Sequence, residues 1–141
     1  MAEAVLDSSA ILAVILSERG AEQVADLMPE SLVSVANEAE VITVLIRNGS
    51  PPEQALSAAL ELPYRRVDLD AELARRAGTL WRDVKPRGLS LGDRCCLALA
   101  ERERLPVVTA DQKWADLALD IEIRMFRSPA HDRGGGKPRR T

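Results

Sequence analysis

Short, mostly apolar runs are spaced along the first 126 residues, and each is bounded by polar residues, glycine or proline. The runs over 4–6, 31–35 and 107–109 predict short buried strands. Two further segments, 64–69 and 121–126, alternate apolar and polar side chains, which predicts two more strands, the second at an edge. Five strands are therefore expected.

The segments between these runs carry apolar residues at helical spacing and end at glycine, proline or polar residues. They predict helices over 10–16, 21–28, 36–48, 51–60, 71–81, 91–104 and 111–117, with a loop over 84–88. Short strands that alternate with helices are typical of an α/β fold. We therefore expect a three-layer α/β/α sandwich around a mostly parallel sheet of about five strands.

Charge is distributed unevenly over the 141 residues. The chain has 19 basic and 22 acidic residues, but residues 127–141 contain five basic residues and one acid, so residues 1–126 carry −7 and the rest +4. The glycine run over 134–136 and the charges around it predict disorder at this end. We expect one domain over 1–126 and a basic, disordered tail over 127–141.

Several classes of protein are disfavoured by residues that are scarce. The single histidine, His131, lies in the basic tail, which argues against histidine-based nucleophilic catalysis and histidine-ligated zinc. Cys95 and Cys96 are adjacent and match no redox or zinc motif, so we expect buried thiols in a reducing, cytoplasmic setting. The longest strongly apolar run, 10–16, is too short to span a membrane. The glycine-rich nucleotide-binding motifs G-x-G-x-x-G and G-x-x-x-x-G-K-S/T are both absent from the sequence.

Four acidic residues fall where predicted strands leave the sheet or where a neighbouring helix begins: Asp7, Glu40, Asp93 and Asp111. The carboxyl ends of parallel strands meet at one edge, so these side chains can converge there. The alternative is that each acid caps a helix, because free N–H groups at a helix N-terminus attract carboxylates. Ser90 with Asp93 has the spacing of a capping box, and Asn37 with Glu40 has that of a variant. Both interpretations remain open on the pattern alone.

Converging carboxylates need a proton or a cation, since two of them ~4 Å apart repel by about 4 kcal/mol at an effective dielectric near 20. Oxygen ligands without histidine or cysteine suit Mg²⁺ or Mn²⁺. Such an ion can bind a phosphodiester and lower the pKa of a bound water. Ser9, Ser34 and Thr109 lie near the same edge, either as supporting hydroxyls or as caps.

The sequence around these acids resembles, in order, the four motifs of PIN-domain proteins, and it is closest to the VapC-like toxins of bacterial toxin–antitoxin pairs. The similarity extends over roughly residues 3–126, and four motifs in order are more specific than any one of them. The matching segments are Val5–Ala13, Ser34–Val41, Leu89–Ala98 and Val108–Asp111. Cys95-Cys96 departs from the family, in which small alanine-like residues are more usual there.

The resemblance implies an endoribonuclease dependent on Mg²⁺ or Mn²⁺, which hydrolyses RNA with a metal-activated water. It also implies a homodimer and inhibition by a small cognate antitoxin protein. Catalytic and metal-binding roles fall, by the same resemblance, on Asp7, Glu40, Asp93 and Asp111.

Two positions in these motifs have rival candidates. Some members of the family use an additional acid after the fourth motif, and Asp116 is the matching candidate for a metal ligand. Glu38 competes with Glu40 for the second motif. We prefer Glu40 because the family pattern places the acid after a small residue and before Val41.

Recognition of RNA is expected to depend on phosphates and shape, because only 3% of the residues are aromatic. We expect Trp81 and Trp114 to pack in the core or in an interface. Arg94 and Lys113 are candidate RNA contacts, and the basic tail can add salt-sensitive affinity. The alternative to a nuclease is a non-catalytic PIN-like module that binds RNA or serves as a scaffold.

Overall fold

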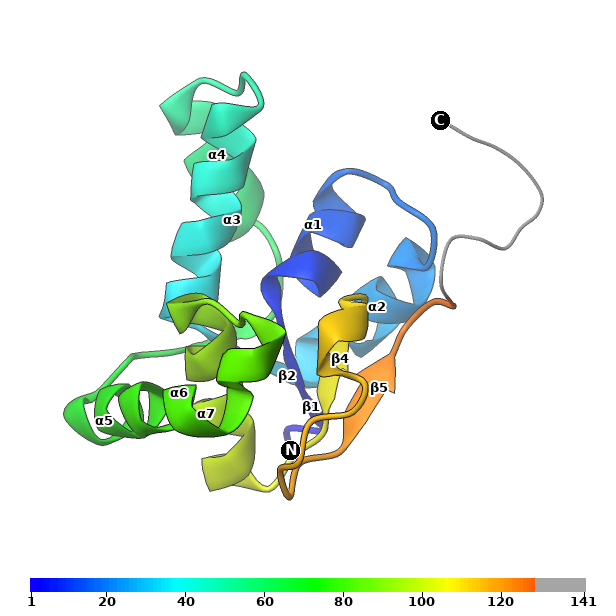
Figure 1. Ribbon diagram of the computed structural model, residues 1–141. Coiled ribbons are helices and arrows are strands. Elements are labelled where there is room, and N and C mark those ends of the chain that lie inside the picture. The colour runs from blue at the N-terminus through cyan, green and yellow to red at the C-terminus, as the bar shows by residue number, and fades with distance from the viewer. Residues whose placement is uncertain (129–141) are drawn as a thin grey trace.

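The computed structural model describes residues 1–128, which form an α/β fold around one sheet (Figure 1). All five strands are parallel and lie in the order β3-β2-β1-β4-β5. The strands are β1 (Ala4–Leu6), β2 (Ser31–Ser34), β3 (Arg65–Val67), β4 (Val107–Thr109) and β5 (Ile123–Met125). The five predicted strands are confirmed, with β5 at an edge.

Helices cover both faces of the sheet, which confirms the predicted α/β sandwich (Figure 1). The longer ones are α1 (Ser8–Ile15), α2 (Ala21–Leu27), α3 (Val35–Arg47), α4 (Pro52–Leu60), α5 (Ala71–Thr79) and α7 (Leu91–Glu103). The shorter ones are η1 (Met28–Glu30), α6 (Trp81–Val84), η2 (Lys85–Arg87) and η3 (Gln112–Trp114).

Two apolar cores lie on opposite faces of the sheet, because successive side chains of a strand point to opposite sides. Val5 of β1 packs in the core formed with α5, α6 and α7. Its neighbours Ala4 and Leu6 pack in the core formed with α1, α2, α3 and α4. All three side chains are fully buried, so the central strand needs no polar face.

Three of the differences from the sequence prediction each have a local reason. Val35 begins α3 instead of ending β2, because the Ser34 side chain caps that helix by accepting from the N–H of Ala36. The helix expected over 111–117 shortens to η3, which Asp111 caps. The loop expected over 84–88 contains η2, which ends at Gly88 with a φ of 66°.

The two tryptophans differ in their surroundings. Trp114 is fully buried in the core beside α7, as predicted. Trp81 is 53% exposed at the start of α6, so it does not pack in the core, and of the two predicted locations only an interface stays a prediction. Lys85 lies 5.3 Å from the centre of its ring. An aromatic side chain and a cation are therefore both available at this surface.

The last described residues are attached to the turn between α1 and α2. Arg127 donates to the backbone carbonyl of Arg19 at 2.8 Å and to Glu18 at 3.2 Å. Arg19 in turn donates to the carbonyl of Ser128 at 2.7 Å. Arg127 and Ser128, the first two residues of the predicted tail, therefore contact the domain. The rest of the predicted tail, 129–141, lies outside the described residues.

Within residues 1–128, the helices are all too short or too polar to cross a membrane. Cys95 and Cys96 are both buried free thiols on α7, as predicted. Burial raises the pKa of the Cys96 thiol well above its ordinary value. Both side chains therefore act as small apolar groups in the core.

Candidate active site

Asp7 occupies the centre of the site, directly after the buried strand β1. Its side chain caps α1 by accepting from the N–H of Ala10 at 3.0 Å. It also accepts from Ser9 Oγ at 2.7 Å and from Thr109 Oγ1 at 2.5 Å. Only 3% of Asp7 is exposed, so this carboxylate is held by three donors below the surface.

Ser9 and Thr109 join the ends of β1 and β4 around Asp7. The backbone N–H of Ala110 donates to Ser9 Oγ at 2.9 Å, and that of Asp111 donates to Thr109 Oγ1 at 2.9 Å. Each hydroxyl therefore accepts from one strand end while it donates to the carboxylate. Both supporting residues predicted from the sequence lie next to Asp7, whereas Ser34 is a helix cap.

Burial raises the pKa of Asp7 to about 6, although hydrogen bonds from Thr109, Ser9 and Ala10 act in the opposite direction. The negative charge of Asp93 raises the pKa of Asp7 further. Burial disfavours a charge because the protein interior solvates it less well than water does. A bound cation would reverse this effect.

Asp93 belongs to the first turn of α7. Ser90 Oγ accepts from the N–H of Asp93 at 3.1 Å, and the Asp93 carboxylate accepts from the N–H of Ser90 at 2.9 Å, so the predicted capping box is present. Burial raises the pKa of Asp93, and so do the negative charges of Glu40 and Asp111. Glu40 and Asp111 therefore both lie within electrostatic reach of Asp93.

Glu40 extends from α3 towards both neighbouring helices. Its Oε1 accepts from Ser8 Oγ at 2.8 Å and from Asn37 Nδ2 at 3.1 Å. Its Oε2 accepts from Ser90 Oγ at 3.3 Å. The carboxylate therefore joins the first turn of α1 to the N-terminus of α7.

Glu38 points away from this site and holds α3 against the other edge of the sheet. It accepts from Tyr64 Oη and from Arg66 Nε, both at 2.6 Å. Arg66 also donates to the carbonyl of Ala59 at the end of α4, at 2.8 Å. These contacts support Glu40, and not Glu38, as the acid of the second motif.

Helix capping and convergence, the two alternatives left open by the pattern, both occur. Asp7, Asp93 and Asp111 each cap a helix or its first turn, and Asp93 still interacts electrostatically with Asp7, Glu40 and Asp111. Within residues 1–128, no three acidic, histidine or cysteine side chains are arranged as a preformed metal cage. The site is therefore a group of neighbouring acids whose ligand geometry is not preassembled.

The remaining predicted residues lie at the margin. Asp116 is exposed on the turn after η3, whereas Asp111 is half-buried and acts on Asp93. Lys113 is exposed on η3. Arg94 is half-buried and donates to the carbonyl of Ala77 on α5 at 3.1 Å, so its guanidinium is partly engaged inside the protein.

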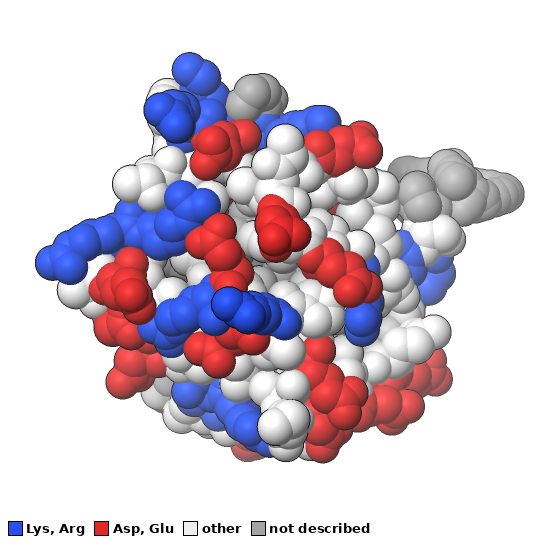
Figure 2. Space-filling model, turned by 90° about the horizontal axis from the view of Figure 1, so that it is seen from below, with Lys and Arg blue, Asp and Glu red and all other residues white. Residues whose placement is uncertain are grey.

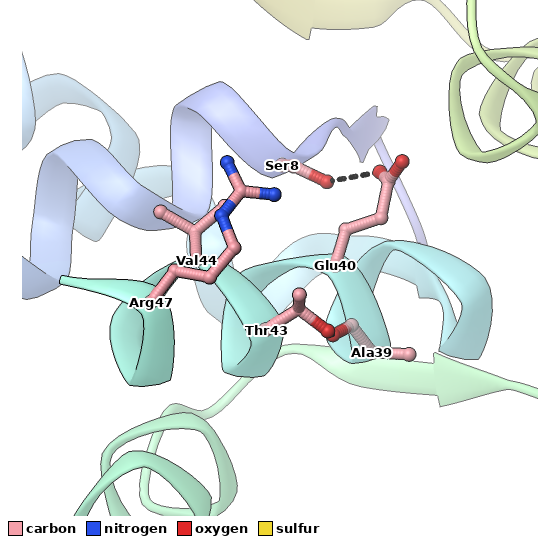
Figure 3. A pocket seen from close by; sticks show the side chains of 6 residues that line it. All are labelled: Ser8, Ala39, Glu40, Thr43, Val44 and Arg47. Carbon is pink, nitrogen blue, oxygen red and sulfur yellow. Dashed lines mark hydrogen bonds between the residues drawn. The ribbon is translucent and has the colours of Figure 1, made fainter. Parts of the chain in front are cut away.

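A pocket of about 380 Å³ opens between α1 and α3 beside Glu40 (Figure 3). Arg47 and Glu40 both extend from α3 on the side facing α1, with Val44 near Arg47. Arg47 makes no ion pair with any of residues 1–128. The residues that line the pocket are Ser8, Ala39, Glu40, Thr43, Val44 and Arg47.

Sequence reasoning missed four residues around Glu40: Ser8, Asn37, Gly92 and Arg47. Asn37 was expected to take part in a variant capping box, which is wrong because Ser34 caps α3 and Asn37 lies fully buried inside the site. Its Nδ2 contacts Ser8 Oγ, Glu40 Oε1 and the Gly92 carbonyl. The distance of 55 residues between Asn37 and Gly92 leaves no local signal for this contact.

Comparison with solved structures shows the same fold in toxin–antitoxin proteins. A toxin–antitoxin complex from Klebsiella pneumoniae matches at a TM-score of 0.70 and 23% identity, covering 90% of this chain and 100% of that one. DNA-bound VapBC from Salmonella typhimurium matches at a TM-score of 0.73 and 18% identity, and the match covers 90% of this chain and 100% of that one. VapC20 of Mycobacterium tuberculosis is described as a toxin that cleaves the Sarcin-Ricin loop. It matches at a TM-score of 0.67 and 19% identity, and the match covers 80% of this chain and 94% of that one.

No curated protein sequence matches the chain. The family model of the PIN domain, however, matches residues 4–119, which include every strand except β5 and all the helices described above. This range contains the four acids of the site and both supporting hydroxyls. The chain belongs to the PIN domain family.

Proposed function

We propose that this protein is a metal-dependent endoribonuclease that acts as the toxin of a toxin–antitoxin pair. The observation that carries the proposal is the position of Asp7, a carboxylate buried at the carboxyl end of the central strand with Asp93 close enough to raise its pKa. Glu40 and Asp111 act on Asp93 from α3 and from the end of β4. The structural likeness to VapC20, described as a Sarcin-Ricin loop cleaving toxin, supports the same function.

The donor set fits Mg²⁺ or Mn²⁺. The available side chains are carboxylates and hydroxyls, and hard cations prefer oxygen ligands. Mg²⁺ commonly binds through one or two carboxylates and keeps several waters, so it does not need a cage of three protein ligands. We assign the ion to Asp7 and Asp93, with Glu40 and Asp111 next to them. When bound, it supplies a Lewis acid and a more acidic water for phosphodiester hydrolysis.

The protein's own residues orient this chemistry. Ser9 and Thr109 fix the direction of the Asp7 carboxylate by donating to its two oxygens. Arg47, in the pocket beside Glu40, and Lys113, on η3 beside Asp111, are exposed cations that suit the phosphates flanking the cleaved bond. Cleavage is thus assigned to the acids and substrate placement to the cations around them.

A protein partner is part of the same proposal. Leu16, Ile46, Leu56 and Leu60 are exposed on or next to α1, α3 and α4. Exposed apolar groups on neighbouring helices are typical of surfaces that another chain covers. The matches to a Klebsiella toxin–antitoxin complex and to Salmonella VapBC support an antitoxin as that partner, and we propose a homodimer as the toxin's own assembly.

Cleavage of total RNA with and without Mn²⁺ tests the function. Asp7→Asn and Asp93→Asn should abolish Mn²⁺-stimulated cleavage, while Asp26→Asn, an exposed aspartate on α2, should leave it unchanged. Unfolding curves for each variant show that the fold is retained. Wild-type protein that binds RNA but neither binds Mn²⁺ nor cleaves RNA would instead be a non-catalytic PIN-like module.

A further inference from the structure

We propose that Gly92 and Asn37 are positioning residues that form a seat for the Glu40 carboxylate beside Asp93. This inference rests on the proposed metal-dependent function, because it explains how an acid from α3 is kept at the metal-binding edge. The seat consists of the backbone surface at Gly92 on α7 and the amide of Asn37 on α3. Ser8 and Ser90 complete it from either side.

Gly92 makes room for the carboxylate. A Cβ atom at this position would overlap Cδ, Oε1 and Oε2 of Glu40. Gly92 is buried in the first turn of α7, where an alanine would favour the helix more than glycine does. Gly78 on α5 shows the contrast, since a Cβ there meets no described atom within 4 Å. The glycine at position 92 is therefore required by its neighbour and not by the helix.

Asn37 holds the carboxylate in that space. Its Nδ2 lies 3.1 Å from Glu40 Oε1 and 3.2 Å from the Gly92 carbonyl. Both of these oxygens are acceptors, which fixes the orientation of the amide. The side chain therefore links the acid to the backbone of α7, directly before Asp93.

The side-chain carbonyl of Asn37 indicates that an asparagine is not needed at this position for packing. Asn37 is fully buried, and its Oδ1 has no hydrogen-bond partner among residues 1–128. An unpartnered buried carbonyl destabilises a fold, and an apolar side chain of similar size avoids that penalty. The amide is therefore retained for the contacts that its nitrogen makes with Glu40, with the Gly92 carbonyl and with Ser8.

Gly92→Ala tests the seat with a matched control. The new Cβ meets only the far end of a flexible side chain, so the protein should fold while Glu40 turns away. Isothermal titration with Mn²⁺ should show a Kd about 10- to 100-fold weaker than that of the wild type. Gly78→Ala, a glycine-to-alanine change in another helix, should bind Mn²⁺ as the wild type does.

Asn37→Leu provides the second arm. It removes the amide donors and also the unpartnered carbonyl, so its thermal midpoint should stay near the wild-type value. Its affinity for Mn²⁺ should fall by about tenfold or more. Asn48→Ala, at the exposed C-terminus of the same helix, is the control and should leave the affinity unchanged.

A crystal structure of metal-free Gly92→Ala separates the possible outcomes. Glu40 displaced from Ser8 and Ser90, together with weakened Mn²⁺ binding, supports the seat. An undisplaced Glu40, or a displaced Glu40 with unchanged affinity for Mn²⁺, overturns the positioning role and leaves the proposed function intact. Wild-type protein that neither binds Mn²⁺ nor cleaves RNA rejects the proposed function, and the positioning role is rejected with it.

Discussion

Two glutamates only two positions apart on α3 have separate roles. Glu38 faces Tyr64 and Arg66, and Glu40 faces Ser8, Asn37 and Ser90. A helix turns about 200° over two residues, so the two side chains leave it on nearly opposite faces. A substitution at one position should therefore not reproduce the effect of a substitution at the other.

We expect Glu38→Gln to lower the free energy of unfolding by about 1–2 kcal/mol, because a partly buried ion pair and a charged acceptor for Tyr64 are lost. RNA cleavage should remain close to that of the wild type. Glu40→Gln should instead reduce cleavage about 100-fold or more with little change in stability. Denaturant unfolding and RNA cleavage rates, measured on both variants, test these separate roles. An equal loss of cleavage in the two variants would contradict them.

Asp7 should make the metal-free protein less stable as the pH rises. Its pKa is 3.8 in the unfolded chain and about 6 in the folded protein, so the folded state binds the proton more tightly. The stability from this group is complete below pH 4 and is lost as the pH rises through 6. Burial of the charge then costs up to about 3 kcal/mol above pH 7.

Asp7→Asn removes that charge and keeps an oxygen for the N–H of Ala10, so we expect it to raise the thermal midpoint at pH 8 in the presence of a chelator. The gain should shrink towards pH 4, where the wild-type carboxyl is protonated in the folded protein and no buried charge remains. Asp26→Asn, which is exposed, is the control. A gain that does not change between pH 8 and pH 4 would show that burial of the charge is not its cause.

Which site residues are predictable depends on whether their signal is local. Asp7 and Asp111 follow apolar strands, and Asp93 follows Ser90 at capping-box spacing, so short-range pattern is enough to find them. Asn37 has no such signal, because its role depends on contacts with Gly92 and Ser8 that form only in the folded chain.

At the scale of elements, helix N-termini explain why the acids are where they are. Asp7, Asp93 and Asp111 each satisfy free backbone N–H groups, which places negative charge at the favourable end of a helix. Because parallel strands deliver α1 and η3 to the same edge of the sheet, capping brings carboxylates together. The fold therefore supplies the acidic site through ordinary helix capping.

The order of strands and helices was predictable because each apolar run is short and each helix has a clear period. The short helices α6 and η2 were not. The region over 81–88 contains α6 and η2, and a proline and a glycine within seven residues of Trp81 are equally compatible with a loop. Only packing of Leu80, Val84 and Leu89 into the core gives this region a defined path.

The turn between α1 and α2 fixes the last described residues. Gly20 has a φ of +88°, and a Cβ there would meet the Phe126 ring at 2.8 Å. Gly20→Ala should therefore lower the free energy of unfolding by about 1–2 kcal/mol for the backbone conformation alone, and by more because of the ring. Thermal unfolding measures this.

Gly49→Ala is the matched control. Gly49 also has a positive φ, +109°, but a Cβ there meets no described atom within 4 Å. It should show the backbone penalty without the collision. If both variants lose the same stability, contact between Gly20 and Phe126 does not hold this end of the domain in place.

At the scale of the whole molecule, part of the basic charge on residues 1–128 is neutralised by neighbouring acids. On the face seen from below in Figure 2, acidic and basic side chains are interspersed. Many of the arginines are paired with acids, such as Arg76 with Glu101 and Arg102 with Asp70. At the active edge, Asp93 interacts electrostatically with Glu40, Asp111 and Asp7. The negative charge that a neighbouring RNA would meet there has to be neutralised locally.

We therefore expect the acidic site to repel RNA in the absence of a divalent ion. With a chelator at low ionic strength, Asp93→Asn should bind a short single-stranded RNA about threefold to tenfold more tightly than the wild type, since removal of one nearby charge is worth about 1 kcal/mol. The difference should disappear in 1 M salt, where the Debye length is about 3 Å. With saturating Mn²⁺ the order should reverse. Equilibrium binding by fluorescence anisotropy measures all three conditions; equal affinities in the chelator at low salt would show that the acids do not control access of RNA to the site.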